Sequence, residues 1–221
     1  ARENRISAIV ATPHVTPGVH TKDDIHDFIQ RIDDLRMLAT EYNIDILDGC
    51  ELFLNHDYQK ALDQNLFIPI ENTQYVLVEI EERLYDVQFK GYTPIIAHVE
   101  RYFKNGLDIE RVNGFIESGC IIQVNATSFL GYHGKQAKKI AFQLLDEGLI
   151  HVIATDTHRA TGSRKPCLNK IFYLLEKKYN YHAIHTLMSE NPLHILKNEW
   201  LEPVYARESF FKKLAKKLKS K

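Results

Sequence analysis

The sequence is poor in cysteine and contains no long hydrophobic run. Its 221 residues include three cysteines, Cys50, Cys120 and Cys167, an odd number without any C-x-x-C pair. This argues against a disulfide framework and favours a reducing compartment. The longest apolar runs, such as residues 6–11 and 149–154, are far shorter than the roughly 20 residues that cross a bilayer. We therefore expect neither a transmembrane helix nor a secretory signal.

The sequence also lacks a large net charge and the glycine-rich loops that bind nucleotides. The formal net charge is -1, which argues against nucleic-acid binding through bulk positive charge. Neither G-x-G-x-x-G nor G-x-x-x-x-G-K occurs, so a nucleotide-binding fold is not favoured. The charge is nevertheless uneven, because residues 207–221 contain seven Lys or Arg and one Glu. A basic end on an acidic body predicts different partners for the two parts.

Six short runs rich in isoleucine and valine predict buried β-strands. They are residues 6–11, 44–47, 75–80, 94–97, 121–124 and 150–154. Helical patterns lie between them: one follows a capping box at Thr21, and two end at Gly119 and Gly148. Residues 169–200 are predicted to be helical throughout. Strands that alternate with helices indicate an α/β protein with a parallel sheet, open or closed into a barrel.

Polar side chains follow most of the predicted strands. In chain order they lie in Thr12-Pro13-His14, Gly49-Cys50-Glu51, His98-Val99-Glu100-Arg101, Asn125 and Asp156-Thr157-His158. Because ligands bind at the carboxyl ends of parallel strands, these groups are expected to converge on one site. Imidazoles mixed with carboxylates suit Zn, Mn or Fe better than Mg or Ca. The pattern therefore predicts a metal centre.

Each of these residues also has an ordinary interpretation. A single histidine such as His14 is more often a loop or capping residue than a ligand. The acidic residues at 79, 81 and 82 either join the site or form a solvated turn, and the turn is the favoured interpretation. The remaining histidines, His133 and His151 among them, are interpreted as surface or packing residues. Arg101 and Arg164 either bring guanidinium groups to a phosphate ester or lie on the surface.

Together the motifs resemble the polymerase-and-histidinol-phosphatase (PHP) family. The resemblance rests on residues 11–14, 49–51, 96–102, 123–125 and 151–158. They are most similar to the manganese-dependent tyrosine phosphatases of capsular and exopolysaccharide loci. The resemblance implies a distorted (β/α) barrel of PHP type over residues 1–201, with its first strand apparently missing, and a basic C-terminal tail over residues 202–221.

The resemblance also implies roles for individual residues. The metal ligands would be His14, Glu51, His98, Asp156 and His158, with Glu51 bridging, and the phosphate-binding catalytic residues would be Arg101 and Arg164. Two or three divalent ions, Mn with Fe or Zn as alternatives, would activate water, so no cysteine nucleophile is needed. The C-x₅-R loop of cysteine phosphatases is indeed absent. The family's first His-x-His motif has no counterpart here, and we therefore expect weak metal binding and low activity.

The expected function is dephosphorylation of a bacterial tyrosine kinase that regulates capsular or exopolysaccharide synthesis, in the cytoplasm or at the inner face of the membrane. Two alternatives stay open: a PHP-type phosphoesterase with a small substrate such as histidinol phosphate, and a non-catalytic regulatory module. The tail is interpreted either as a peripheral contact with anionic membrane or as a solvated end. No nucleic-acid partner is expected, and homo-oligomerisation is left open.

Overall fold

A computed structural model describes residues 1–81, 91–162 and 164–207 of the chain, and all the strands in these residues pair in parallel. The strands are β1 (Ala8–Val10), β2 (His14–Val15), β3 (Asp45–Leu47), β4 (Glu51–Leu54), β5 (Tyr75–Ile80), β6 (Thr93–Ile96), β7 (Ile121–Asn125) and β8 (Val152–Ala154). They form a two-stranded sheet, β1-β3, and a six-stranded sheet in the order β2-β4-β5-β6-β7-β8. A short break separates β1 from β2 and β3 from β4, so β2 continues the course of β1 and β4 continues that of β3.

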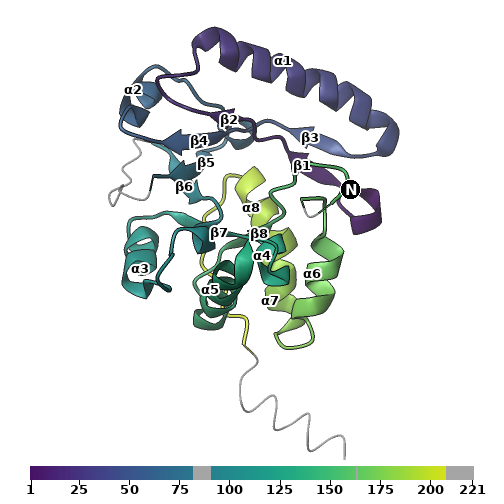
Figure 1. Cartoon of the computed structure of the whole chain (residues 1–221). Coiled ribbons are helices and arrows are strands. Elements are labelled where there is room, and N and C mark those ends of the chain that lie inside the picture. The colour runs from purple at the N-terminus through teal and green to yellow at the C-terminus, as the bar shows by residue number, and fades with distance from the viewer. Residues whose placement is uncertain (82–90, 163, 208–221) are drawn as a thin grey trace, which may run out of the picture.

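Helices surround the strands on both sides (Figure 1). They are α1 (Lys22–Ala39), α2 (Tyr58–Asp63), α3 (Ile109–Glu117), α4 (Ala126–Leu130), α5 (Gly134–Glu147), α6 (Leu168–Leu175), α7 (Tyr181–His185) and α8 (Asn191–Leu196). Helix α1 runs along β1 to β4 at one end of the molecule, while α3 to α7 gather around β6 to β8. Within the described residues none of these helices has the length and hydropathy needed to cross a bilayer.

Local sequence signals set the ends of several helices. The predicted capping box at Thr21 is confirmed: the Thr21 backbone N–H donates to Asp24 Oδ2 over 2.7 Å, and its hydroxyl accepts from the Asp24 N–H. Gly119 and Gly148 have φ angles of +84° and +70°, the left-handed conformation predicted where α3 and α5 end. Glycine is required at 148 for a second reason, since a Cβ there would lie 2.9 Å from the Tyr205 ring.

The α/β fold with a parallel sheet is confirmed, and all six predicted strands are present. Residues 169–200, predicted to be helical throughout, are helical over most of that range but not over residues 176–180 or 197–200. The chain turns after α6, and the side chain of Asn180 accepts hydrogen bonds from His182 N and Ala183 N at the start of α7. Asparagine is a strong N-cap residue because its carbonyl oxygen satisfies free helical N–H groups, so it starts a new helix here.

The two faces of the sheet differ, and this difference positions the site. Residues facing the helices form a large apolar core. The inner face carries a smaller apolar cluster that includes Tyr75, Ile95, Ile121 and Val152, near the beginnings of their strands. Further along β7 the inward positions become polar, with Gln123 and Asn125 both buried. The inner space is therefore apolar at one end and polar at the end where the strands finish.

The strands do not close into a continuous barrel in the described residues, because no pairing joins β8 to β1. The C-terminal segment seals the apolar end: Val204 N donates to Ile150 O over 2.8 Å, and Leu201 and Ala206 are buried. Residues 202–207 thus contact the body, whereas the rest of the predicted basic tail, with its membrane interpretation, lies outside the described residues. A single domain with a separate tail stays a prediction.

All three cysteines are buried and free, as expected of a chain without a disulfide framework. Cys50 is fully buried, and its sulfur accepts a hydrogen bond from Ile68 N over 3.2 Å. Burial raises the pKa of the Cys50 thiol to about 12 and that of Cys120 to about 11. These side chains behave as small apolar residues.

A buried histidine between β7 and β8 makes stability depend on pH. His151 is 2% exposed, and its Nδ1 accepts a hydrogen bond from Ile122 N over 3.0 Å. Burial lowers the pKa of His151 from 6.5 to about 4. Between these pH values the unfolded chain binds the additional proton, so the contribution of His151 is complete above pH 6.5 and is lost as the pH falls towards 4.

We therefore expect the free energy of unfolding of the chain to fall by up to about 3 kcal/mol through this group between pH 7 and pH 4, since a tenfold change in proton affinity is worth about 1.4 kcal/mol. Urea unfolding of the chain and of His151→Asn, whose amide oxygen can replace the Nδ1 acceptor, measures the difference. Parallel pH profiles for the two proteins would contradict this assignment.

Candidate metal centre

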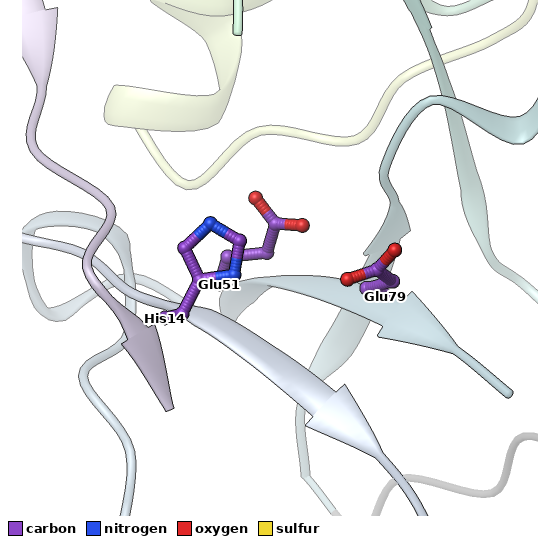
Figure 2. Close-up of side chains that lie close together, drawn as sticks. All are labelled: His14, Glu51 and Glu79. Carbon is purple, nitrogen blue, oxygen red and sulfur yellow. The ribbon is translucent and has the colours of Figure 1, made fainter. Parts of the chain in front are cut away.

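Three ligand-type side chains meet where β2, β4 and β5 lie side by side. His14 in β2 is directly opposite Glu51 in β4, and Glu79 follows on the neighbouring strand β5. One ligand atom from each of the three residues lies within 4.8 Å of the others. Figure 2 shows the three side chains on the same side of these strands. Glu51 is buried, Glu79 is half-buried and His14 is exposed, so the group opens to solvent at one side.

His98, which follows β6, completes this half of the site. Its Nε2 lies 3.0 Å from Glu51 Oε1 and 3.9 Å from Glu79 Oε1. The ring is 3% exposed, and its Nδ1 has no hydrogen-bond partner among the residues that the structure describes. The predicted site residues from β2, β4 and β6 are thus brought together on one face of the sheet.

Of the two interpretations of the acidic residues at 79, 81 and 82, the favoured solvated turn is wrong for Glu79, and the alternative, that it joins the other ligand-type side chains, holds. This residue lies in the cluster with His14 and Glu51, because it shares the inward face of β5 with Tyr75 and Leu77. Glu81 instead lies 4.0 Å from the exposed ring of His56. Glu82 lies outside the described residues. The alternation of β5 carried the missed signal, since residues 75, 77 and 79 point to the same side of a strand.

The second half of the site follows β8. Arg164 Nη2 donates to Asp156 Oδ2 and to His158 Nε2, each over 3.1 Å. Arg101 Nη1 lies 3.9 Å from the same Asp156 oxygen. His158 Nδ1 is 3.2 Å from Asp156 Oδ1. Two guanidinium groups from distant elements therefore converge on one carboxylate.

The two halves adjoin. The His14 and His158 ring centroids are 5.7 Å apart although 144 positions separate them in the sequence. All seven side chains singled out from the sequence, the five ligand candidates and the two arginines, belong to these two halves. His14 and Glu51 are the first residues of β2 and β4, and the other five follow β6 and β8. Their individual roles as metal ligands and phosphate-binding groups stay predictions.

Two further titratable groups border the site without belonging to either half. Glu100 is 1% exposed; burial raises its pKa to about 7, although hydrogen bonds from Ser128 Oγ and Asn125 N act in the opposite direction. His133 is half-buried, and its Nε2 lies 2.8 Å from Thr127 Oγ1. Burial and the nearby Arg101 lower the pKa of His133. His133, interpreted from the sequence as surface or packing, therefore lies within electrostatic range of the arginines.

The donor set fits a divalent metal ion. Imidazole and carboxylate groups together suit Mn, Fe or Zn. Glu51 is 4% exposed, yet within the described residues its carboxylate has a hydrogen bond only with the His98 ring. Buried charges are costly unless they are paired or coordinate a metal, and here Glu79 adds a second negative charge. A divalent cation would balance both carboxylates.

The sequence matches the family model described as "Capsular polysaccharide synthesis, CpsB/CapC" over residues 1–197. The chain belongs to this family. Tyrosine-protein phosphatase YwqE of Bacillus subtilis is 28% identical over 93% of this chain and 86% of its own length. Tyrosine-protein phosphatase CpsB of Streptococcus pneumoniae is 28% identical over 88% of this chain and 86% of its own.

The fold leads to the same family. A solved structure from a set described as "YwqE from Bacillus subtilis and CpsB from Streptococcus pneumoniae, unique metal-dependent tyrosine phosphatases" superposes with a TM-score of 0.74 and 25% identity. The match covers 94% of this chain and 88% of the solved one. The resemblance to the capsule-locus tyrosine phosphatases, stated from the sequence motifs, is thereby confirmed for the family and for the fold.

Proposed function

We propose that this chain is a metal-dependent protein-tyrosine phosphatase of capsular or exopolysaccharide synthesis. The observation that carries the proposal is the junction of two different groups: the His14, Glu51 and Glu79 cluster lies beside the Asp156 carboxylate on which Arg101 and Arg164 converge. A metal cluster beside paired guanidinium groups suits a phosphate monoester. The printed names of the relatives support this chemistry.

The geometry supports a proposed role for each group of side chains. His14, Glu51, Glu79 and His98 would hold metal on one side, and Asp156 and His158 on the other. Divalent ions bound there would lower the pKa of a coordinated water and neutralise charge on the ester.

Arg101 and Arg164 would bind the phosphate oxygens through their N–H groups. Asp156 holds the Arg164 guanidinium over 3.1 Å and so aims it at the same space. The three buried cysteines take no part, because none reaches the site as a thiolate.

Manganese is the proposed metal, in two or three ions, with iron and zinc as alternatives that the same donor set accepts. The proposed substrate is a phosphotyrosine protein, a bacterial tyrosine kinase of polysaccharide synthesis, met in the cytoplasm. The proposal also includes a membrane contact through the basic tail, most of which lies outside the described residues, and a homo-oligomer.

The proposal predicts Mn²⁺-dependent hydrolysis of a phosphotyrosine peptide. We expect the chain to release phosphate slowly, to stop when EDTA is added and to resume when Mn²⁺ is restored in excess. Phosphate release from the peptide is compared with release from histidinol phosphate at equal concentration. Faster turnover of histidinol phosphate would favour the small-molecule phosphoesterase, and no turnover of either substrate at saturating Mn²⁺ would favour the non-catalytic module.

A further inference from the structure

Two of the candidate ligands stand on strained backbone. His98 has a φ angle of 37° and Asp156 a φ angle of 48°. Each is the second residue after the end of a strand, β6 and β8 respectively. Residues other than glycine rarely adopt this left-handed conformation, which costs on the order of 1–3 kcal/mol and persists only where the surroundings impose it. Glycine would remove the strain but supply no ligand. Each of these two loops therefore needs a local restraint.

Strand β7, which lies between β6 and β8, supplies a restraint to both loops. Gln123 and Asn125 occupy alternate positions of β7 and so share its inner face, where they are 4% and 0% exposed. The Gln123 side-chain oxygen accepts a hydrogen bond from the His98 backbone N–H over 2.6 Å. Asn125 Nδ2 donates to Asp156 Oδ2 over 2.9 Å.

The two amides are also bonded to each other. Gln123 Nε2 donates to Asn125 Oδ1 over 2.9 Å. The three bonds form one continuous chain that runs from the His98 N–H, through both amides, to the Asp156 carboxylate, with every donor pointing the same way. Turning either amide over would set donor against donor or acceptor against acceptor. Because this chain of hydrogen bonds ends on a charged acceptor, its three bonds strengthen one another.

We propose that Gln123 and Asn125 act as a single clamp that positions His98 and Asp156 relative to each other across β7. The inference rests on the proposed metal centre. Gln123 and Asn125 touch neither metal nor substrate in this scheme and are positioning residues. Partners behind the ligands commonly change metal affinity by 10- to 100-fold. The clamp links one ligand from each half of the site, so it sets the separation of the two halves.

The test measures Mn²⁺ affinity rather than turnover. Gln123→Met and Asn125→Leu remove the amides with little loss of bulk, and the double variant removes both. The electron paramagnetic resonance signal of free Mn²⁺ reports affinity for the whole chain, and thermal unfolding in EDTA reports folding. We expect each single variant to bind Mn²⁺ 10- to 100-fold more weakly. The double variant should bind Mn²⁺ no more weakly than the weaker-binding single variant, because the loss of either amide already breaks the clamp.

Thr127→Val is the matched control. Thr127 is a buried polar residue of α4, 2% exposed, and its hydroxyl contacts His133 and not the clamp. Its Mn²⁺ affinity should remain within about twofold of the unsubstituted chain, as expected of a site outside the network. If the Met and Leu variants do not fold in EDTA, Gln123→Ala and Asn125→Ala, which add no bulk, replace them.

The outcomes separate the clamp from the metal centre. Single variants that bind Mn²⁺ as tightly as the unsubstituted chain, or losses that multiply in the double variant, would overturn the clamp while leaving the metal centre intact. An unsubstituted chain that binds no Mn²⁺ would instead overturn the metal centre and, with it, the proposed function.

Discussion

Replacing Glu51 with glutamine is expected to weaken Mn²⁺ binding by at least about 100-fold, the upper end of what is lost when the shell around a metal is disturbed. Glutamine has the same shape but lacks the charge. Glu51 is the most buried member of the cluster, and it faces His14, Glu79 and His98 together. Isothermal titration with Mn²⁺ measures the loss. Because the change also removes one of two neighbouring negative charges, the unfolding temperature in EDTA should not fall.

Glu81→Gln is the control for this experiment. Glu81 follows β5 two positions after Glu79, but it approaches His56 instead of the cluster. Its substitution should leave the Mn²⁺ affinity unchanged, whereas Glu79→Gln should lower it. Equal affinities of the Glu51→Gln protein and the unsubstituted chain would refute the assignment of this cluster as the metal centre.

Removing either arginine should lower phosphotyrosine hydrolysis by about 100- to 1,000-fold, the range seen when one donor to a charged transition state is lost. Arg101 and Arg164 approach the same Asp156 oxygen from separate elements, and their side chains are 38% and 41% exposed, so a substrate can reach them. Arg101→Lys and Arg164→Lys should restore little, because lysine keeps the charge but not the two-pronged geometry. Initial rates at saturating Mn²⁺ measure the effect.

Arg159→Ala provides the comparison on the same loop. Arg159 is exposed, and its backbone N–H bonds to Arg164 O. Its substitution should change the rate by less than about twofold, as for most surface changes. Mn²⁺ affinity of the Arg101 and Arg164 variants should be unchanged or tighter, since a nearby positive charge has been removed. Arginine variants that lose Mn²⁺ binding would show that the two side chains support the ligands rather than the phosphate.

Much of the site could be predicted because most of its residues lie shortly after a run that the sequence predicts as a strand. The run at residues 150–154 ends two positions before Asp156, and the run at 94–97 ends one position before His98. In a parallel sheet such positions meet at one edge whatever the loops between them do. Convergence over 144 positions, as for His14 and His158, thus follows from strand order and needs no knowledge of side-chain contacts.

Glu79 and the β7 amides could not be assigned in the same way. Glu79 lies inside an apolar strand and has two acidic neighbours, so its face is fixed by the register with β4 and not by composition. The strained backbone at His98 and Asp156 is held by tertiary hydrogen bonds with Gln123 and Asn125, which local sequence does not encode. Strands β2 and β4 were not predicted, because a short break in the chain separates each of them from the predicted strand before it, β1 or β3.

The burial of Cys50, Cys120 and Cys167 has a consequence for the conditions under which such a phosphatase can work. Phosphatases that attack with a cysteine need an exposed thiolate, and peroxide oxidises that same thiolate to sulfenic and then irreversible acids. Here the thiols are protonated and shielded, and the proposed chemistry does not use them. Peroxide at levels that silence thiol phosphatases would find no exposed thiolate to oxidise, and tyrosine dephosphorylation would escape control through cysteine redox state.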